Sequence, residues 1–329
     1  MPGGFDADDG VDVPASADPR SAELRSAETV PALRAAGCVF AEDEAAILIE
    51  AAAGPDDDDS EPNLDELVAR RVSGEPLEQI VGWVDFSGMR LSVQPGAFVP
   101  RQRTALLAAH AVSAAQRMTD SRGNRAGTDS LRNGSEADAG VAAARPVVLE
   151  AFCGVGPVGS AVAGKVPGVD LHLGDAQVEA LRCAVENVER HIQTIQPGDS
   201  AQVGEPDTIV TGHVLDCLHG LSDTLRQSIS VIAAVPPYVP ETAADFLPHE
   251  ALDFEPSTAL FGGRDGLDLV RRLIAESLDW LAPDGVLLIE LGRGQVASAT
   301  GFATERGLEA RSHLGEDEQT VVLELRCRN

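Results

Sequence analysis

The feature that most constrains the fold of this chain is the regular alternation of strand-like and helix-like segments over residues 146–329. Segments with apolar residues at helical spacing separate short apolar runs, which read VVLEAF, VDLHLGD, TIVTGHVLD, SISVIAAV and GVLLIEL. Strands that alternate with helices form a parallel sheet through right-handed crossovers. The last two strand candidates, LEARSHL and TVVLELR, are close enough in sequence to pair antiparallel. We therefore predict a doubly wound α/β sheet with one reversed strand at its end.

The rest of the chain divides into four parts. Residues 1–20 are acidic, aperiodic and rich in Gly, Pro and Ala, which predicts a disordered tail. Residues 21–79 carry apolar residues at helical spacing, which predicts a helical domain. Residues 80–116 have a strand-like pattern around a Ser-Gly turn and then an Ala- and Leu-rich stretch, which predicts a β-hairpin and a connecting helix. Residues 117–145 are poor in apolar residues and rich in turn formers, which predicts a flexible linker before the sheet domain of residues 146–329.

The charge of the chain limits its partners. It carries 53 acidic against 25 basic residues, a net charge of −28, and a field of that sign repels phosphate backbones. We therefore expect no direct nucleic-acid partner. No signal sequence and no apolar run of membrane-spanning length are evident, so we expect a cytoplasmic protein without a membrane partner. Five scattered cysteines without a CxxC pair predict neither a disulfide framework nor a metal site.

A glycine-rich turn follows the first strand of the predicted sheet. Gly154, Gly156 and Gly159 match the GxGxxG spacing of dinucleotide sites, although a tight strand-to-helix turn also explains them. Asp175 ends the second strand, where its carboxylate can bind two ribose hydroxyls or cap the next helix. These residues fit an NAD site and an S-adenosylmethionine site alike. Glu150 can meet the amino group of a methionine moiety, and the reversed final strand fits a methyltransferase sheet, so S-adenosylmethionine is favoured.

The run VIAAVPPYVP ends an apolar strand at two prolines. Prolines remove backbone donors and fix φ, so they end the strand and stiffen the loop that follows. Tyr238, the only tyrosine in the chain, comes next. One interpretation is a strand terminator with a packed aromatic ring, and the other is a loop that serves the active site.

Six segments together resemble the HemK-type protein-(glutamine-N5) methyltransferases, which modify the GGQ glutamine of peptide chain release factors. They are the glycine-rich turn, AAGCVFAEDEA, GEPLEQIVGWVDFSG, PGAFVPRQRT, VPPYVP and EPSTALFGGRDGLDLVRRL. The resemblance covers most of residues 23–116 and 147–326 and extends especially to actinobacterial relatives of unassigned substrate. Each segment is weakly specific alone, but together they are highly specific. The resemblance implies a Rossmann-like seven-stranded S-adenosylmethionine-dependent methyltransferase sheet, a small N-terminal helical domain that helps to hold a protein substrate, and a connecting β-hairpin.

The resemblance implies which residues bind the cofactor, S-adenosylmethionine. The turn from Glu150 to Gly154 would line its methionine end, Asp175 would hold the ribose, and Asp216 with Cys217 would lie beside the adenine. The complete expected set is Glu150, Ala151, Phe152, Cys153, Gly154, Gly156, Asp175, Asp216, Cys217 and Val235. A helix cap would explain Asp216 equally well, and a small packing residue would explain Cys217.

The resemblance also implies a catalytic loop, from which this sequence departs at one position. In the family pattern (Asn/Asp)-Pro-Pro-Tyr, the Asn side chain and a backbone carbonyl accept the N–H bonds of the target amide, and the tyrosine ring packs against it. Pro236, Pro237 and Tyr238 match as catalytic residues, but the Asn position is Val235, which cannot accept a hydrogen bond. Substrate contacts are expected at Val235 and at two arginines near the mouth of the site, Arg101 and Arg103, although solvent-exposed charge would explain the arginines equally well.

These inferences predict an N-methyltransferase that acts on a glutamine side-chain amide of a protein such as a peptide chain release factor. Loss of one oriented polar contact, as at Val235, costs on the order of 10²–10³ in rate. Two alternatives remain open: a cofactor-binding homologue that has lost methyl transfer, and a small-molecule methyltransferase. A nucleic-acid amino-methyltransferase would share the loop, but the net charge of −28 argues against it.

Overall fold

The structure, a computed structural model, describes residues 19–53, 63–132, 145–195 and 208–328. Most of the predicted N-terminal tail therefore lies outside the described residues. The chain divides into two compact units, Met1–Val81 and Gly82–Asn329, and each is described by itself.

The first unit is a group of short helices around a small apolar core. Its helices are α1 (Pro19–Ala35), α2 (Ala41–Ala52), α3 (Leu64–Val72) and α4 (Leu77–Val81). The Asn63 side chain caps α3 by accepting from the Asp65 N–H, and an ion pair between Arg71 and Glu44 joins α3 to α2. The buried core residues are Leu33, Ala41, Ala45, Leu48, Leu67 and Ile80.

The second unit opens with a hairpin and a long helix. Strands β1 (Trp83–Phe86) and β2 (Met89–Ser92) pair antiparallel around a turn at Ser87 and Gly88, and both turn residues have positive φ. The short helix η1 (Gln102–Thr104) then leads into α5 (Ala105–Arg132).

The length of α5 corrects the predicted linker. The helix covers residues 117–132, where a flexible segment was expected, and residues 133–144 lie outside the described residues. Extending a helix costs far less than starting one, and no proline interrupts this stretch. The hydroxyls of Thr119 and Ser121 donate to carbonyls one turn earlier, so these polar side chains are accommodated within the helix.

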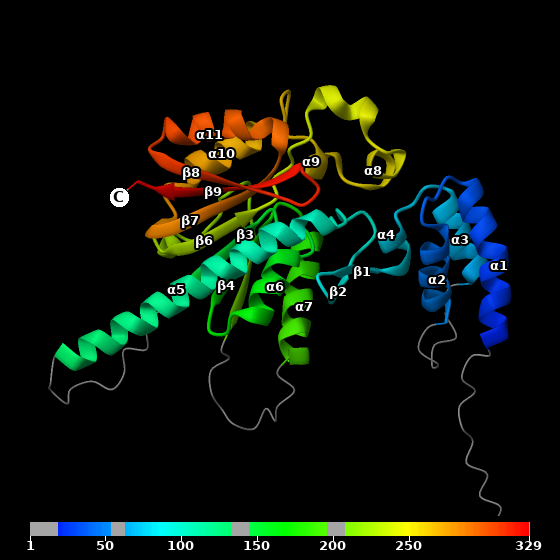
Figure 1. The fold of residues 1–329 in the computed structure, drawn as a ribbon, viewed down its shortest axis with the longest axis horizontal. Helices are drawn as coiled ribbons and strands as arrows, with labels where there is room; N and C mark the ends of the chain where they lie inside the picture. Colours follow the sequence, from blue (N-terminus) through cyan, green and yellow to red (C-terminus); the bar gives the residue numbers. More distant parts are fainter. Residues whose placement is uncertain (1–18, 54–62, 133–144, 196–207, 329) are drawn as a thin grey trace, which may run out of the picture. The chain divides into compact units, whose positions relative to one another are not determined.

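The sheet of the second unit has seven strands in the order β5-β4-β3-β6-β7-β9-β8. The strands are β3 (Val147–Ala151), β4 (Asp170–Asp175), β5 (Ile209–Val214), β6 (Ile229–Ala234), β7 (Leu281–Gly292), β8 (Leu308–Leu314) and β9 (Thr320–Cys327). The first five are parallel, and β9 runs antiparallel between β7 and β8. This order confirms the predicted doubly wound sheet with a reversed final strand (Figure 1).

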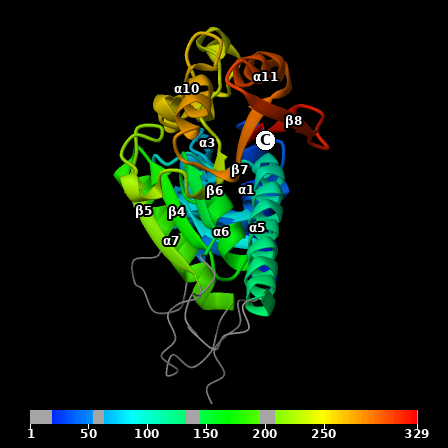
Figure 2. The same ribbon diagram turned by 90° about the vertical axis from the view of Figure 1, so that its left-hand side faces the viewer.

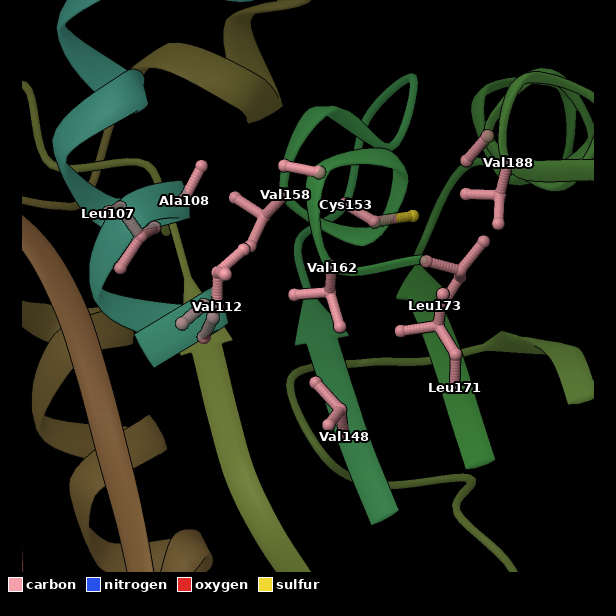
Figure 3. Close-up of a cluster of buried hydrophobic side chains, with 14 of the residues drawn as sticks. Leu107, Ala108, Val112, Val148, Cys153, Val158, Val162, Leu171, Leu173 and Val188 are labelled. Carbon is pink, nitrogen blue, oxygen red and sulfur yellow. The ribbon is translucent and has the colours of Figure 1, made fainter. Parts of the chain in front are cut away.

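Helices cover both faces of this sheet, as Figures 1 and 2 show. On one face α5 packs with α6 (Pro157–Lys165) and α7 (Val178–Ile195). Their apolar residues meet the strand residues Val148, Leu171 and Leu173 in the buried cluster of Figure 3. The opposite face is covered by α10 (Asp268–Ser277) and α11 (Val296–Thr304). Short elements between the strands are η2 (Asp223–Leu225), η3 (Glu241–Phe246), α8 (His249–Phe254), α9 (Ser257–Leu260) and η4 (Arg293–Gln295).

The strand order fixes where a ligand can bind. The chain leaves β3 toward β4 and β5 on one side and later returns to β6 on the other, so the connections after β3 and β6 diverge. Ligands of open α/β sheets bind at such a point, outside the carboxyl ends of the strands. Among the described helices, none combines the length and apolarity needed to cross a bilayer.

Candidate active site

A cavity of about 650 Å³ lies at this point of the sheet. The predicted site residues that line it are Arg101, Arg103, Glu150, Phe152, Cys153, Gly154, Asp175, Asp216, Cys217, Val235, Pro236, Pro237 and Tyr238. We call the part lined by residues 150–154 and Asp175 the turn end. The part lined by Arg103, Val235–Tyr238 and Glu290 is the loop end.

The glycine-rich turn leaves β3 through a left-handed backbone. Phe152 and Gly154 have φ values of 56° and 52°, and a non-glycine residue there stores strain of roughly 1–2 kcal/mol. A Cβ atom at Gly154 would meet no atom within 4 Å, because this residue faces the open cavity. Backbone strain of this kind clusters at ligand sites, so the turn is shaped for a ligand that approaches Gly154.

Two residues of the expected cofactor set do not line the cavity. Ala151 is fully buried in the core on the opposite face of the sheet, because side chains alternate along β3. Gly156 has a φ of 79°, and a Cβ there would come within 3.0 Å of the Ala184 Cβ. Gly156 therefore allows α6 to approach α7, and in neither case does the structure support the direct cofactor contact that we predicted.

Glu150 is buried beneath the turn. Its two carboxylate oxygens accept the N–H groups of Val158 (3.1 Å) and Gly159 (2.6 Å) in the first turn of α6. Burial raises the pKa of this carboxyl to about 8, while the two N–H bonds act to lower it and the nearby Asp175 to raise it. The carboxylate thus holds the start of α6 and also lines the cavity.

Gly159 is the third glycine of the GxGxxG pattern, and packing explains it. A Cβ atom there would lie 2.6 Å from the Leu173 Cδ2 and 2.9 Å from the Glu150 Oε2. The space that a side chain would need is already filled, so Gly159 supports the position of Glu150.

Asp175 combines both roles that the sequence left open. Its Oδ1 accepts the Gln177 N–H (2.9 Å), as a cap before α7 would, and its Oδ2 accepts the Gly154 N–H (2.8 Å). The carboxylate ties the glycine-rich turn to the end of β4 and lines the cavity. Its remaining lone pairs are available to ligand hydroxyls.

Asp216 and Cys217 also line the cavity. Asp216 is exposed, and its Oδ1 accepts from Arg272 Nη1 at 2.6 Å, which lowers the pKa of the carboxyl. Cys217 is buried with a φ of 59°, and burial raises the pKa of its thiol to about 12. A thiol with so high a pKa is not a nucleophile at neutral pH, in agreement with a packing role.

At the loop end, the two prolines hold a loop that packs tightly. Pro236 and Pro237 are buried, and a Cβ at Gly262 would lie 2.3 Å from the Pro237 carbonyl oxygen. The Gln295 amide donates to the Tyr238 carbonyl at 2.8 Å from the far side of the loop. The backbone from 236 to 238 is therefore fixed by local packing and by one distant side chain.

Tyr238 lies between two charged groups from other parts of the chain. Its hydroxyl accepts from Arg103 Nη2 (3.0 Å) and donates to Glu290 Oε1 (3.2 Å). Burial and the neighbouring Glu290 raise the pKa of the phenol, and burial also raises the pKa of Glu290. Tyr238 is thus more than a packed strand terminator, and Arg103 is more than an exposed charge.

Arg101 is also held in place. Its Nη2 lies 2.7 Å and 2.6 Å from the two oxygens of Glu255, a carboxylate that is almost fully buried. The guanidinium also stacks over the Phe98 ring. This pairing fixes the segment that leads from the hairpin to Arg103.

Three residues of this region were not predicted: Glu255, Glu290 and Gln295. A signal for Glu290 exists in the sequence, because an acidic residue stands inside the otherwise apolar run GVLLIEL. Glu255 opens the segment EPSTALFGG, whose resemblance does not single out its first residue, and Gln295 ends the short helix η4 without such a signal. Their roles depend on contacts with residues distant in sequence.

No family model matches the chain. The release factor glutamine methyltransferase of Streptomyces coelicolor is 29% identical over 243 residues, covering 74% of this chain and 72% of that protein. The enzyme of that name from Nitratidesulfovibrio vulgaris is 30% identical over 240 residues, covering 73% and 67%. A 4-amino-L-phenylalanine/4-methylamino-L-phenylalanine methyltransferase of Streptomyces pristinaespiralis is 29% identical over 253 residues, covering 76% and 73%.

The resemblance inferred from six short segments thus extends over about three quarters of the chain. Together with the seven-stranded sheet and the cavity at its switch point, it leads to one assignment. The chain belongs to the release factor glutamine methyltransferase family and is accordingly a methyltransferase.

Proposed function

We propose that this protein transfers a methyl group from S-adenosylmethionine to the side-chain amide nitrogen of a glutamine in a protein, with a peptide chain release factor as the favoured substrate. Such a substrate places the reaction in the cytoplasm. The observation that carries the proposal is the fixed loop Pro236–Tyr238, which faces the glycine-rich turn across one cavity.

The turn end fits the proposed cofactor. S-adenosylmethionine carries a sulfonium and an ammonium group, and when bound it supplies an electrophilic methyl group. The carboxylate of Asp175 gives this wall of the cavity a negative character, and Gly154 leaves the space that a ligand needs. The Glu150 carboxyl, whose pKa burial raises to about 8, would ionise when the ammonium group of the ligand lies beside it. Asp175 would accept hydrogen bonds from ribose hydroxyls, while Glu150 would face the ammonium group.

The loop end fits an acceptor that must be positioned rather than deprotonated by a strong base. An amide nitrogen is a poor nucleophile because its lone pair is delocalised into the carbonyl. Holding it in line with the reacting methyl group supplies much of the acceleration. The Tyr238 ring, fixed through Arg103 and Glu290, would form one wall for the amide, and backbone carbonyls of the loop would accept one N–H.

Val235 is where the loop departs from the family pattern. Its side chain is partly buried against the core cluster and offers no acceptor. An inactive homologue and a small-molecule enzyme were the alternatives that this residue raised. Both are less favoured, because the relatives of S. coelicolor and N. vulgaris are named release factor glutamine methyltransferases. The relative of S. pristinaespiralis, which is named for a small-molecule acceptor, makes that acceptor the one to test second.

Incubation with radiolabelled S-adenosylmethionine and a GGQ-containing release factor tests the proposal. We expect label at the GGQ glutamine, and little label when Tyr238→Ala replaces the wild-type enzyme. Calorimetric titration should show that S-adenosylmethionine binds and that NAD does not. Binding of NAD alone would refute the proposed cofactor, and absence of label despite cofactor binding would refute the proposed substrate.

A further inference from the structure

We infer that Glu290 supplies the hydrogen-bond acceptor for the substrate nitrogen that the side chain at position 235 lacks. This inference rests on the proposed function, because it assigns the acceptor group of the same site. It names a residue on β7, one strand away from the loop that carries the family motif.

The sheet register brings Glu290 beside Val235. Strands β6 and β7 pair in parallel up to Ala234 with Ile289, so the next residues along the two chains are Val235 and Glu290. Neighbouring strands lie about 4.8 Å apart, and residues in register project to the same face. An acceptor on Glu290 is therefore displaced by about one strand spacing from the position where the family pattern has its Asn.

The burial pattern confirms that both side chains point to this face. The residues two positions earlier, Ala233 and Leu288, belong to the same buried cluster, and Val235 packs against it. Because side chains alternate along a strand, Val235 and Glu290 continue that face to its edge. Both residues line the cavity.

The Glu290 carboxylate has one oxygen that makes no hydrogen bond in the part of the chain that the structure describes. Its side chain is 1% exposed, and its Oε1 accepts from Tyr238 and lies 3.4 Å from the Arg103 Nε. Its Oε2 is buried without a hydrogen bond among the residues that the structure describes. The Thr104 hydroxyl lies near enough to lower the carboxyl pKa, but it makes no bond of normal geometry to Oε2.

A buried carboxylate oxygen without a partner is costly, and such a group in a native structure calls for an explanation, of which a catalytic role is one. The place of Glu290 on the cavity wall points to that role. A primary amide or amine nitrogen provides the missing donor. Bound to Oε2, one N–H would fix the rotation of the nitrogen, with the Tyr238 ring beside it.

The same oxygen accounts for the proton that methyl transfer releases. The nitrogen lone pair forms the new N–C bond, and the electrons of the broken S–C bond return to sulfur, which becomes a neutral thioether. The nitrogen then gives one proton to Oε2 of Glu290, and water in the cavity removes it. No oxidant or further reactant is needed.

The test compares Glu290→Gln with Glu324→Gln, using labelled S-adenosylmethionine and a GGQ-containing release factor. Glu324 is a matched control because it lies across from Leu288 on β9, is partly buried and hydrogen-bonded to Arg326, and does not line the cavity. In Glu290→Gln the amide oxygen would stay with the donors Arg103 and Tyr238, so the NH2 group, a donor, would take the place of Oε2. We therefore expect Glu290→Gln to lower kcat by roughly 10²–10³ with unchanged affinity for S-adenosylmethionine, and Glu324→Gln to leave kcat unchanged.

A second substitution distinguishes two roles of Glu290: accepting the substrate N–H, and holding the side chains of Tyr238 and Arg103 in place. If Glu290 only holds these two side chains, Val235→Asn cannot replace it. If Glu290 accepts the substrate N–H, Val235→Asn in the Glu290→Gln background restores an acceptor, and kcat should recover at least tenfold. Wild-type kcat in Glu290→Gln, or no recovery in the folded double variant, overturns the inference. If Glu290→Gln fails to fold, Glu290→Asp is used instead. It keeps the negative charge near Arg103 but is one methylene group shorter, which moves its oxygens away from the substrate nitrogen, so we expect the same loss of kcat.

Failure of the proposed function gives a different result. Wild-type protein that binds the cofactor but labels no release factor overturns the protein substrate. The same variants are then measured with 4-amino-L-phenylalanine, whose primary amine offers the same N–H donors. If Glu290→Gln loses this labelling and the double variant recovers it, the role of Glu290 is supported. If Glu290→Gln still labels 4-amino-L-phenylalanine, that role is overturned. Labelling of neither acceptor overturns both proposals.

Discussion

The two ends of the cavity are held together in different ways. At the turn end, Glu150 and Asp175 bind backbone N–H groups that are 2 to 21 residues away in sequence. At the loop end, Arg103, Tyr238 and Glu290 hold one another through side chains that are 135 and 52 residues apart. The turn end is therefore a local motif with fixed backbone geometry, while the loop end depends on the packing of the whole unit. Substitutions at the two ends should have different consequences.

The largest expected effect tests the burial of Glu150 at the turn end. Its pKa is about 8 in the folded protein and 4.5 in the unfolded chain, so between these pH values the unfolded state binds fewer protons. The free energy of unfolding should therefore fall as pH rises through this window, by as much as about 1.4 kcal/mol per pH unit. Glu150→Gln should remove this contribution. Urea unfolding at pH 5, 6, 7 and 8 measures the two slopes, with the exposed Glu309→Gln as control. Equal slopes for wild type and Glu150→Gln would show that Glu150 is not protonated in the folded state.

The next effect separates ligand binding from capping at the same end. Asp175→Ala should weaken S-adenosylmethionine binding by about 1.5–3 kcal/mol, since ribose hydroxyls lose a charged acceptor. Asp317→Ala is the matched control, because Asp317 also accepts the N–H two residues ahead but does not line the cavity. Calorimetry gives both affinities. If Asp175→Ala lowers only the thermal stability, as Asp317→Ala should, the capping role is sufficient.

A smaller effect is expected from crowding the turn end. Gly159→Ala pushes a methyl group against Leu173 and Glu150, two side chains that can shift partly, and should cost about 1–2 kcal/mol of unfolding free energy. Gly301→Ala, also inside a helix, meets no atom within 4 Å and should stabilise the protein by up to about 1 kcal/mol. Denaturant unfolding measures both. Similar values for the two variants would mean that the packing around Gly159 is loose.

The smallest effect concerns the distant support of the loop end. Gln295→Ala removes the hydrogen bond to the Tyr238 carbonyl and should cost about 1 kcal/mol, roughly fivefold in kcat, with unchanged affinity for the cofactor. The exposed Gln193→Ala on α7 serves as control. A change in cofactor affinity instead of kcat would contradict the separation of the two ends.

The same difference explains what the sequence could predict. The residues of the turn end come from one short segment of the sequence, which contains a strand, three glycines and an acidic residue after the next strand. Its position could be inferred, although two of the predicted cofactor residues, Ala151 and Gly156, do not line the cavity. Only part of the loop end could be predicted from the sequence. The sequence predicts a role for Tyr238. Its hydrogen bond to Glu290, however, depends on the register between β6 and β7, which the spacing of residues along the sequence does not reveal. Residues 117–132 were not predicted to be helical, because their polar composition does not show that a helix that begins in the packed residues before them can continue through them.

The long separation between Arg103, Tyr238 and Glu290 also has a consequence for how the protein is made. During synthesis, residues 147–175 emerge together and can form the β3–α6–β4 unit and its turn early, since short loops close at little entropic cost. Glu290 is added much later, and until β7 pairs with β6 the phenol of Tyr238 has no carboxylate to meet. We therefore expect a refolding chain to acquire cofactor binding before methyl transfer. Stopped-flow refolding with both readouts would show two phases, the slower one belonging to catalysis.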